Sequence, residues 1–171
     1  MKTRRRAIAF FPVMLLSASL LLPLSGARAE AFSGAVAAAP VLDVMERVAD
    51  WQLAHPSQHP TTDWTQGAGY AGMMALADIS PHPRFTAAML SMGQKNGWQL
   101  GPNPYHADDH VVGQTYAELY FKFHDPKMIA PMRARFDDIL ANPHDGTMEF
   151  TVPGNQDRWS WCDALFMAPP A

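Results

Sequence analysis

The sequence has a single cysteine, Cys162, among 171 residues, and no long apolar run beyond residue 24. An intrachain disulfide cannot form with one cysteine, so the stability of the protein must come from a packed core. No later segment approaches the roughly 20 apolar residues that span a bilayer, which argues against a further membrane span. Cys162 lies in an apolar run between Trp161 and Asp163, and this context predicts a small buried side chain rather than a nucleophile.

Acidic residues are absent from the first 29 positions, which hold five of the 13 Lys and Arg residues. A basic start (Met1–Arg6), an apolar stretch (Ala7–Leu22) and a small-x-small triplet (Ala27–Ala29) follow one another there. This order is typical of a secretory signal peptide cleaved after Ala29, although an uncleaved membrane anchor is the alternative. We therefore expect residues 1–29 to be a signal peptide and the protein to be exported, either periplasmic or extracellular.

Positive charge is scarce in the rest of the chain. Beyond residue 29 there are eight basic and 16 acidic side chains, a net charge of −8 over 142 residues. Nucleic-acid binding driven by bulk positive charge is thereby excluded, and after signal cleavage no membrane partner is expected. The sequence contains no phosphate-binding loop, nucleophile elbow or dinucleotide fingerprint. The segment His106–His110 lacks metal-ligand spacing, so no metal and no cofactor is predicted.

Helical periodicity dominates the remaining sequence, which is 48% hydrophobic. After a flexible lead over 30–39, apolar spacing and turn residues predict six helices. The first carries an apolar stripe of Val41, Val44, Met45, Val48 and Trp51. Residues 147–152 could form a short strand. The predicted helices cover 41–54, 65–78, 83–96, 108–123, a fifth from residue 125 onward, and a sixth that opens near residue 163.

Long connections follow the first, third and fifth predicted helices, whereas those after the second and fourth are short. In an antiparallel helical array alternate connections lie at the same end, so the three long ones should share one rim. An acidic residue at a helix start is by itself best explained as a cap. The joint pattern instead favours a sugar-binding cleft of flat rings and carboxylates. The residues at this rim are Trp51, Trp64, Trp98, Trp159 and Trp161, with Asp63, Asp108, Asp109 and Asp163.

Three segments resemble the unsaturated-uronyl hydrolases, which are glycoside hydrolase family 105 and the related family 88. The segments are 63–72 (DWTQGAGYAG), 109–114 (DHVVGQ) and 159–170 (WSWCDALFMAPP). The resemblance covers residues 40–171 and is closer to family 105. It implies an all-α, (α/α)6 barrel of helical hairpins, of which this chain would supply about three as an incomplete half-barrel. An incomplete barrel should expose an apolar seam.

The resemblance also implies an activity. Such enzymes release a Δ4,5-unsaturated uronic acid from the non-reducing end of lyase-generated oligosaccharides of the pectin or rhamnogalacturonan type, by hydration of the C4=C5 double bond. Carried over by motif, Asp163 would be the general acid/base and Asp109 the supporting carboxylate. The candidate substrate-binding residues are Trp64, Tyr70, Trp159 and Trp161.

Residues 40–171 are accordingly interpreted as the N-terminal part of a six-hairpin glycosidase domain, with little activity expected from this chain alone. Two other interpretations stay open. One is a carbohydrate-binding or degenerate non-catalytic helical module, and the other is a different (α/α)6 sugar enzyme. The sequence leaves the oligomeric state undetermined.

Overall fold

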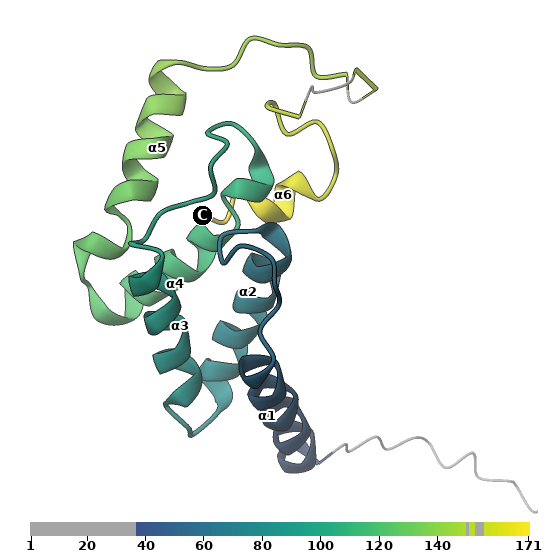
Figure 1. The fold of residues 1–171 in the computed structure, drawn as a ribbon, viewed down its shortest axis with the longest axis vertical. Helices are drawn as coiled ribbons and strands as arrows, with labels where there is room; N and C mark the ends of the chain where they lie inside the picture. The colour runs from purple at the N-terminus through teal and green to yellow at the C-terminus, as the bar shows by residue number, and fades with distance from the viewer. Residues whose placement is uncertain (1–36, 150, 153–155) are drawn as a thin grey trace, which may run out of the picture. The chain divides into compact units, whose positions relative to one another are not determined.

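A computed structural model describes residues 37–149, 151–152 and 156–171 (Figure 1). The predicted signal peptide and most of the predicted lead lie outside the described residues. Within the described ranges the secondary structure is helical and contains no strand. The elements are α1 (Ala38–Ala54), α2 (Trp64–Ile79), α3 (Arg84–Lys95), the 3-10 segment η1 (Ala107–Asp109), α4 (Val112–Phe123), the 3-10 segment η2 (Pro126–Met128), α5 (Ala130–Ala141) and α6 (Ala164–Met167).

The all-helical prediction is confirmed, and six α-helices lie close to the predicted positions. α1 begins at Ala38, inside the predicted lead over 30–39, and two other helices begin later than predicted. The fourth helix begins at Val112 rather than residue 108, because residues 107–109 form a 3-10 turn that is tied to the preceding loop. The fifth begins at Ala130, after a 3-10 segment that Asp125 caps through the backbone N–H of Lys127. Pro131 stands at the start of α5 and has no backbone N–H, which prevents the two segments from forming one continuous helix.

The predicted strand at 147–152 does not form in its described part. A backbone hydrogen bond from Val152 N to Glu149 O, 3.2 Å long, makes a turn there instead. No other strand exists among the described residues to pair with it. An isolated strand is not stable without such pairing.

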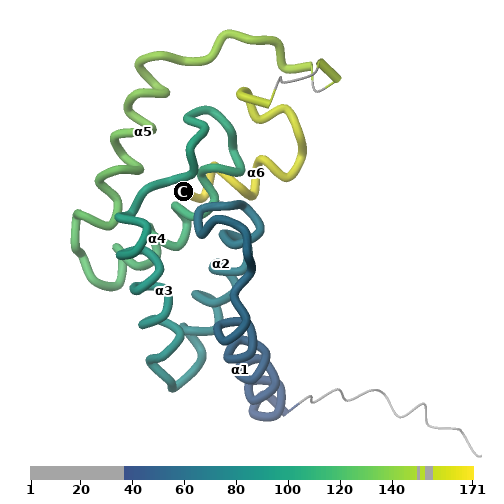
Figure 2. Tube along the Cα trace, in the orientation of Figure 1, coloured from purple at the N-terminus to yellow at the C-terminus, as the bar shows by residue number. Residues whose placement is uncertain are grey.

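α2 and α4 occupy the middle of the structure. α2 packs against both α3 and α4, while α1 lies on the outer side of α2 and α5 extends away from the group (Figures 1 and 2). The short connections join α2 to α3 and α4 to α5. The long connections, over 55–63, 96–111 and 142–163, lie before α2, α4 and α6. This alternation of covered and outer helices is that of a partial helical-hairpin glycosidase fold.

The main core lies between α2, α3 and α4. Met74, Phe85, Tyr116 and Leu119 are fully buried there. The Tyr116 hydroxyl accepts a hydrogen bond from Asn96 Nδ2 at 2.9 Å and donates one to the Gln99 carbonyl at 3.1 Å. Burial raises the pKa of this hydroxyl to about 12. A large ring can therefore sit in the core because its polar atom has both of its partners.

The predicted apolar stripe of α1 is not buried. Val48 is 62% exposed and Trp51 is 59% exposed, and Ala49 is the buried residue of this helix. α1 contributes Ala49 and Leu42 to the main core, and the residues of the stripe are exposed. An exposed apolar seam, expected of an incomplete barrel, does run along α1. In the described residues, no helix is both long enough and apolar enough to cross a membrane.

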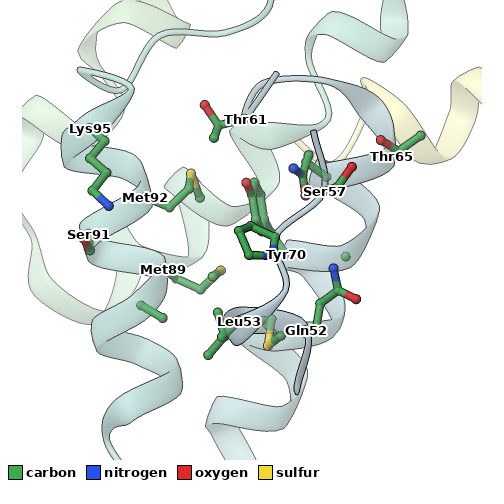
Figure 3. Close-up of a pocket in the computed structure, with 15 residues that line it drawn as sticks. Gln52, Leu53, Ser57, Thr61, Thr65, Tyr70, Met89, Ser91, Met92 and Lys95 are labelled. Carbon is green, nitrogen blue, oxygen red and sulfur yellow. The ribbon is translucent and has the colours of Figure 1, made fainter. Parts of the chain in front are cut away.

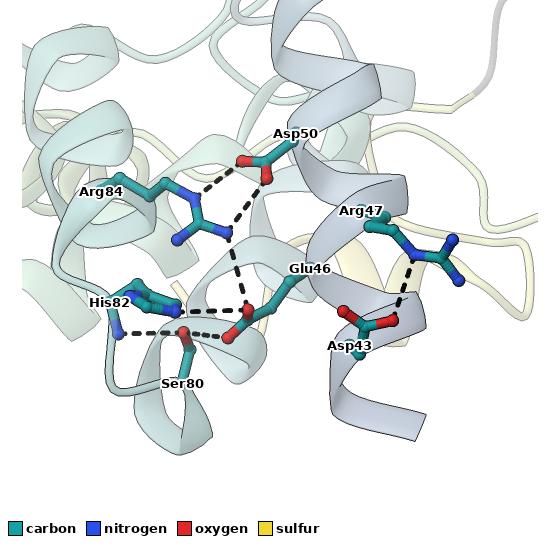
Figure 4. Close-up of polar contacts among 7 residues, drawn as sticks. All are labelled: Asp43, Glu46, Arg47, Asp50, Ser80, His82 and Arg84. Atoms are coloured by element: carbon teal, nitrogen blue, oxygen red, sulfur yellow. Dashed lines mark hydrogen bonds and ion pairs between the residues drawn. The ribbon is translucent and has the colours of Figure 1, made fainter. Parts of the chain in front are cut away.

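Polar contacts attach α1 to the corner between α2 and α3 (Figure 4). The Arg84 guanidinium binds both carboxylate oxygens of Asp50, at 2.8 and 3.0 Å. Glu46 accepts a 2.6 Å hydrogen bond from the Ser80 hydroxyl and lies 3.6 Å from Arg84 and from His82. These contacts hold α1 in place although it buries little apolar surface.

Candidate active site

The three segments that carry the family resemblance pack against one another. On α2, a Cβ atom added to Gly67 would lie 2.4 Å from Val111 Cγ1, so the glycine allows the two helices to approach closely. Val111 is fully buried in a second, smaller core with Ala164 and Met167 of the α6 region. Trp159 and Trp161 pack on its edge. The starts of α2, α4 and α6 therefore lie at one end of the structure, as the connection lengths predicted.

Gln114 joins α4 to α6. Its side-chain N–H group donates to the backbone carbonyls of Phe166 and Met167. The last carbonyls of a helix have no partner within the helix, so this amide satisfies groups that would otherwise need solvent. The glutamine that ends the second motif thus fixes the short helix that follows Asp163.

Carboxylates and one exposed ring meet around a cavity of about 300 Å³ at this end. Trp64 forms part of the wall and is 46% exposed, which leaves its ring free to contact a ligand. Asp163 does not line this cavity, although its charge acts on a residue that does. The lining residues are Pro60, Thr62, Asp63, Trp64, Pro102, Asn103, His106, Asp108 and Asp109.

Asp108 is the carboxyl group of this cavity whose environment favours a bound proton. Burial is the main cause that raises its pKa, and the negative charges of Asp163, Asp109 and Asp63 raise it further. His106, whose Nδ1 lies 3.9 Å from Asp108 Oδ2, acts in the opposite direction. Oδ1 of Asp108 is buried and has no hydrogen-bond partner within the described part of the chain. The sequence places Asp108 at the rim but gives no sign of its role, because the burial of its carboxyl group cannot be read from the motif.

Asp109 is held by the loop that precedes it. Its backbone carbonyl accepts a 2.7 Å hydrogen bond from Gly101 N, and its Oδ2 accepts one of 2.9 Å from Asn103 Nδ2. A Cβ atom on Gly101 would lie 2.0 Å from Asp109 Oδ1, so only glycine fits against this carboxylate. The structure thus fixes the orientation of Asp109 toward the cavity through backbone and amide donors.

Asp163 and Asp63 differ in what their side chains do. Asp63 caps α2, accepting from the Thr65 backbone N–H at 2.9 Å and from its hydroxyl at 2.6 Å. The Thr65 hydrogen bonds lower the pKa of Asp63. Asp163 is exposed and makes no side-chain capping bond, although its carbonyl accepts from Phe166 N at 2.9 Å. Capping therefore accounts for Asp63, while the Asp163 carboxylate is not committed to the helix.

His110 and Trp159 anchor the loop before α6. His110 is fully buried, burial lowers its pKa, and Nε2 lies 2.9 Å from the Pro104 carbonyl. A neutral ring therefore donates through Nε2. Trp159 contacts His110 edge-on and donates from its indole N–H to the Tyr105 carbonyl at 2.8 Å. Trp159 is thus part of the support of the site, a role that its position at the rim did not reveal.

Trp161 and Cys162 are adjacent in sequence but have different surroundings. The Trp161 ring lies 4.9 Å from the His106 ring and packs on the smaller core. Cys162 is exposed, so the prediction that it is buried was wrong. Trp159 and Trp161, which both precede Cys162 in the sequence, make the apolar contacts of this loop.

Tyr70 does not join the carboxylates. It lines a separate cavity of about 600 Å³ between the end of α1, α2 and α3 (Figure 3). Two further rim tryptophans also lie apart from the carboxylates. The Trp98 ring covers Gly93, where a Cβ would meet it at 2.2 Å, and Trp51 stacks on His55. Of the predicted substrate-binding residues, Trp64, Trp159 and Trp161 lie around the carboxylate end, and Tyr70 lies elsewhere.

The residues of this site offer no metal-binding set. Within the described ranges no three His, Cys, Asp or Glu side chains are placed to hold one metal ion. The chemistry available in this part of the chain is that of carboxyl groups beside indole rings.

A helical-hairpin scaffold with carboxylates and tryptophans at the long-loop end is suited to binding sugars. Residues 43–171 match the model of Glycosyl Hydrolase Family 88, and the chain belongs to this family, which is related to family 105.

Two curated relatives share the name unsaturated 3S-rhamnoglycuronyl hydrolase. The protein from Formosa agariphila is 33% identical over 134 residues, which cover 74% of this chain and 35% of the relative. The protein from Alteromonas sp. (strain LOR) is 30% identical over 150 residues, which cover 74% of this chain and 36% of the relative. The chain therefore spans about a third of the length of the curated relatives that it matches.

Proposed function

We propose that this chain supplies the carboxylate end of an exported hydrolase. The enzyme would remove a Δ4,5-unsaturated uronic acid from the non-reducing end of oligosaccharides of the rhamnogalacturonan type. The observation that carries the proposal is the meeting of Asp108, Asp109 and Trp64 around one cavity, with the charge of Asp163 acting on Asp108. The name of both relatives, unsaturated 3S-rhamnoglycuronyl hydrolase, supports an unsaturated uronyl substrate, while the rhamnogalacturonan type rests on the resemblance to family 105.

The proposed reaction is a hydration. A carboxylic acid gives its proton to C4 of the C4=C5 vinyl ether, and water adds at C5 while its proton passes to the carboxylate. The hemiketal formed in this way opens, and the remaining sugar is released. The resemblance by motif assigns the acid/base role to Asp163, whose carboxylate is not engaged in capping α6. Asp109, held by Gly101 and Asn103, supports the reacting carboxyl group.

The carboxylates around Asp108 have a use in this chemistry. A general acid must keep its proton near neutral pH, and like charges close together favour the protonated form. Asp108 interacts with Asp163 and Asp109 in this way. The raised pKa of Asp108 therefore favours a bound proton on this side chain.

We expect little turnover from the 171-residue chain alone. None of the residues that line the carboxylate cavity is Arg or Lys, so a uronate there would find no cationic partner. A binding module without turnover is the second candidate function, and the exposed position of Asp163 outside the lined cavity favours it.

A chimera separates the two candidates. Residues 43–171 would replace the matched segment of the Formosa agariphila relative, and loss of the unsaturated-uronate absorbance would be followed with lyase-digested rhamnogalacturonan. Turnover that disappears in Asp163→Asn, while substrate binding persists, supports the hydrolase. Binding without turnover in a folded parent chimera would establish the binding module instead. Asp137→Asn on α5 is a matched control, since it removes one carboxylate far from the cavity lining.

A further inference from the structure

The cavity around Tyr70 is a second built pocket in the described part of the chain. It holds about 600 Å³, within the range of pockets that take small ligands. Figure 3 shows Tyr70, Met89 and Met92 directed into the space between α2 and α3, with Lys95 at its border. The pocket shares no lining residue with the carboxylate cavity, although segment 60–66 contributes to both.

The roof of this pocket is fastened on two sides. The Thr61 hydroxyl donates to Asn96 Oδ1 at 2.5 Å, which ties the loop after α1 to the end of α3. Gln66 Nε2 donates to the His59 carbonyl at 3.3 Å, which ties the same loop to α2. On the floor a Cβ atom at Gly69 would meet nothing within 4 Å, so open space reaches the helix backbone. The loop that borders the cavity is thus attached to both α2 and α3.

The chemistry of the lining is one-sided. Lys95 is its only charged side chain, and Lys95 is exposed and forms no ion pair within the described residues. Tyr70 is half-buried, burial raises the pKa of its hydroxyl, and that hydroxyl makes no hydrogen bond in the described part of the chain. Methionine side chains form an apolar wall, while the serine and threonine hydroxyls are Ser57, Thr61, Thr65 and Ser91.

These features together suit an anionic pyranose. Sugar rings present an apolar face that packs on a flat ring or on methionine, and an edge of hydroxyls that bond to Ser and Thr. An acidic substituent finds its cation in Lys95, in a chain whose net charge is otherwise negative. We propose that this pocket is an accessory binding site for one or two units of an acidic oligosaccharide, separate from the carboxylate cavity. The choice of a sugar as the ligand rests on the proposed function.

Binding is tested on the 171-residue chain by calorimetry with saturated digalacturonate, which lacks the reactive double bond. A sulfated disaccharide tests whether a sulfate replaces the carboxylate, and either anion supports the proposal. Lys95→Gln is expected to weaken binding about fivefold, and the effect should shrink at high salt. Tyr70→Phe, which keeps the ring, should weaken it about threefold. Lys127→Gln, outside the pocket, is the matched control and should leave the affinity unchanged.

The contrary outcomes are distinct. The proposal is overturned if neither anionic disaccharide binds, or if Lys95→Gln binds them as tightly as the parent does. A neutral disaccharide that binds as tightly as the acidic ones also overturns the proposal. So does binding of decanoate, a carboxylate with an apolar chain, if it depends on Lys95 while no sugar binds. Trp64→Ala should impair turnover in the chimera without altering digalacturonate affinity. Failure of the accessory site and failure of the hydrolase are therefore read from different variants.

Discussion

α4 and α1 have similar amphipathic sequences, but the apolar side of α4 is buried and that of α1 is exposed. Six of the 12 residues of α4 are buried, whereas one of the 17 residues of α1 is buried. α4 has α2 and α3 on its apolar side, whereas the residues of the α1 stripe are exposed, although Val44, Met45 and Val48 border a hollow that α1 shares with α2. Periodicity identifies the apolar side of a helix, but only the tertiary structure supplies the surface that covers it.

The largest test of this contrast compares one leucine with one valine. Leu119→Ala in α4 should lower the free energy of unfolding by about 2 to 5 kcal/mol, because it leaves a cavity at a fully buried position. Val48→Ala in α1, at a position that is 62% exposed, should change it by less than about 0.5 kcal/mol. Urea denaturation of both variants measures the difference. Equal losses would show that the α1 stripe is covered in solution.

A matched pair of glycines within α2 sharpens the same comparison. Gly67→Ala should destabilise by about 1 to 3 kcal/mol, because the new Cβ would lie 2.4 Å from the fully buried Val111. Gly72→Ala has nothing within 4 Å and should stabilise α2 by up to about 1 kcal/mol through helix propensity. Thermal unfolding of the two variants should move in opposite directions. A shift of the same sign would disprove the close contact between the first two motif segments.

α2 shows which features of the site the sequence predicts and which it does not. Periodicity predicts that α2 is a helix. The connection lengths predict the end of the structure at which the three motif segments meet. Trp64 and Tyr70 were assigned to one cleft, yet six residues at 3.6 per turn place them about 120° apart around the helix. The structure accordingly directs them into different cavities. That separation was accessible from the sequence, whereas the burial of Asp108 and His110 was not, since it depends on loops packed from distant parts of the chain.

His110 makes the loop core sensitive to pH. Its folded pKa is lowered below the ordinary value of 6.5, so the unfolded state takes up the proton more readily. The stabilising contribution is therefore complete above pH 6.5 and is lost as the pH falls through the folded pKa. Asp108, whose folded pKa is raised, works in the opposite sense, with a contribution that is complete below pH 3.8 and is lost as the pH rises through its folded pKa.

Urea midpoints measured from pH 7.5 down to pH 5 test the histidine. The parent chain should lose stability over this interval, and His110→Gln should lose less, because its side chain cannot take up a proton. His124→Gln, at the exposed end of α4, is the control and should follow the parent. If His110→Gln retains the full loss, another group is responsible for the pH dependence.

The smallest expected effect concerns the polar contacts that hold α1. Arg84 binds Asp50 through two nitrogens and also reaches Glu46, whereas Arg47, within the described residues, pairs with Asp43 alone, on the same helix (Figure 4). Because these side chains lie at the surface, Arg84→Ala should lower the melting temperature slightly at low salt and less at high salt. Arg47→Ala should leave it unchanged, since its pair links no two elements. A larger loss for Arg47 than for Arg84 would mean that α1 is held by its own helicity rather than by its contacts with the α2–α3 corner. Such a result would contradict the attachment of α1 through the contacts of Arg84 with Asp50 and Glu46.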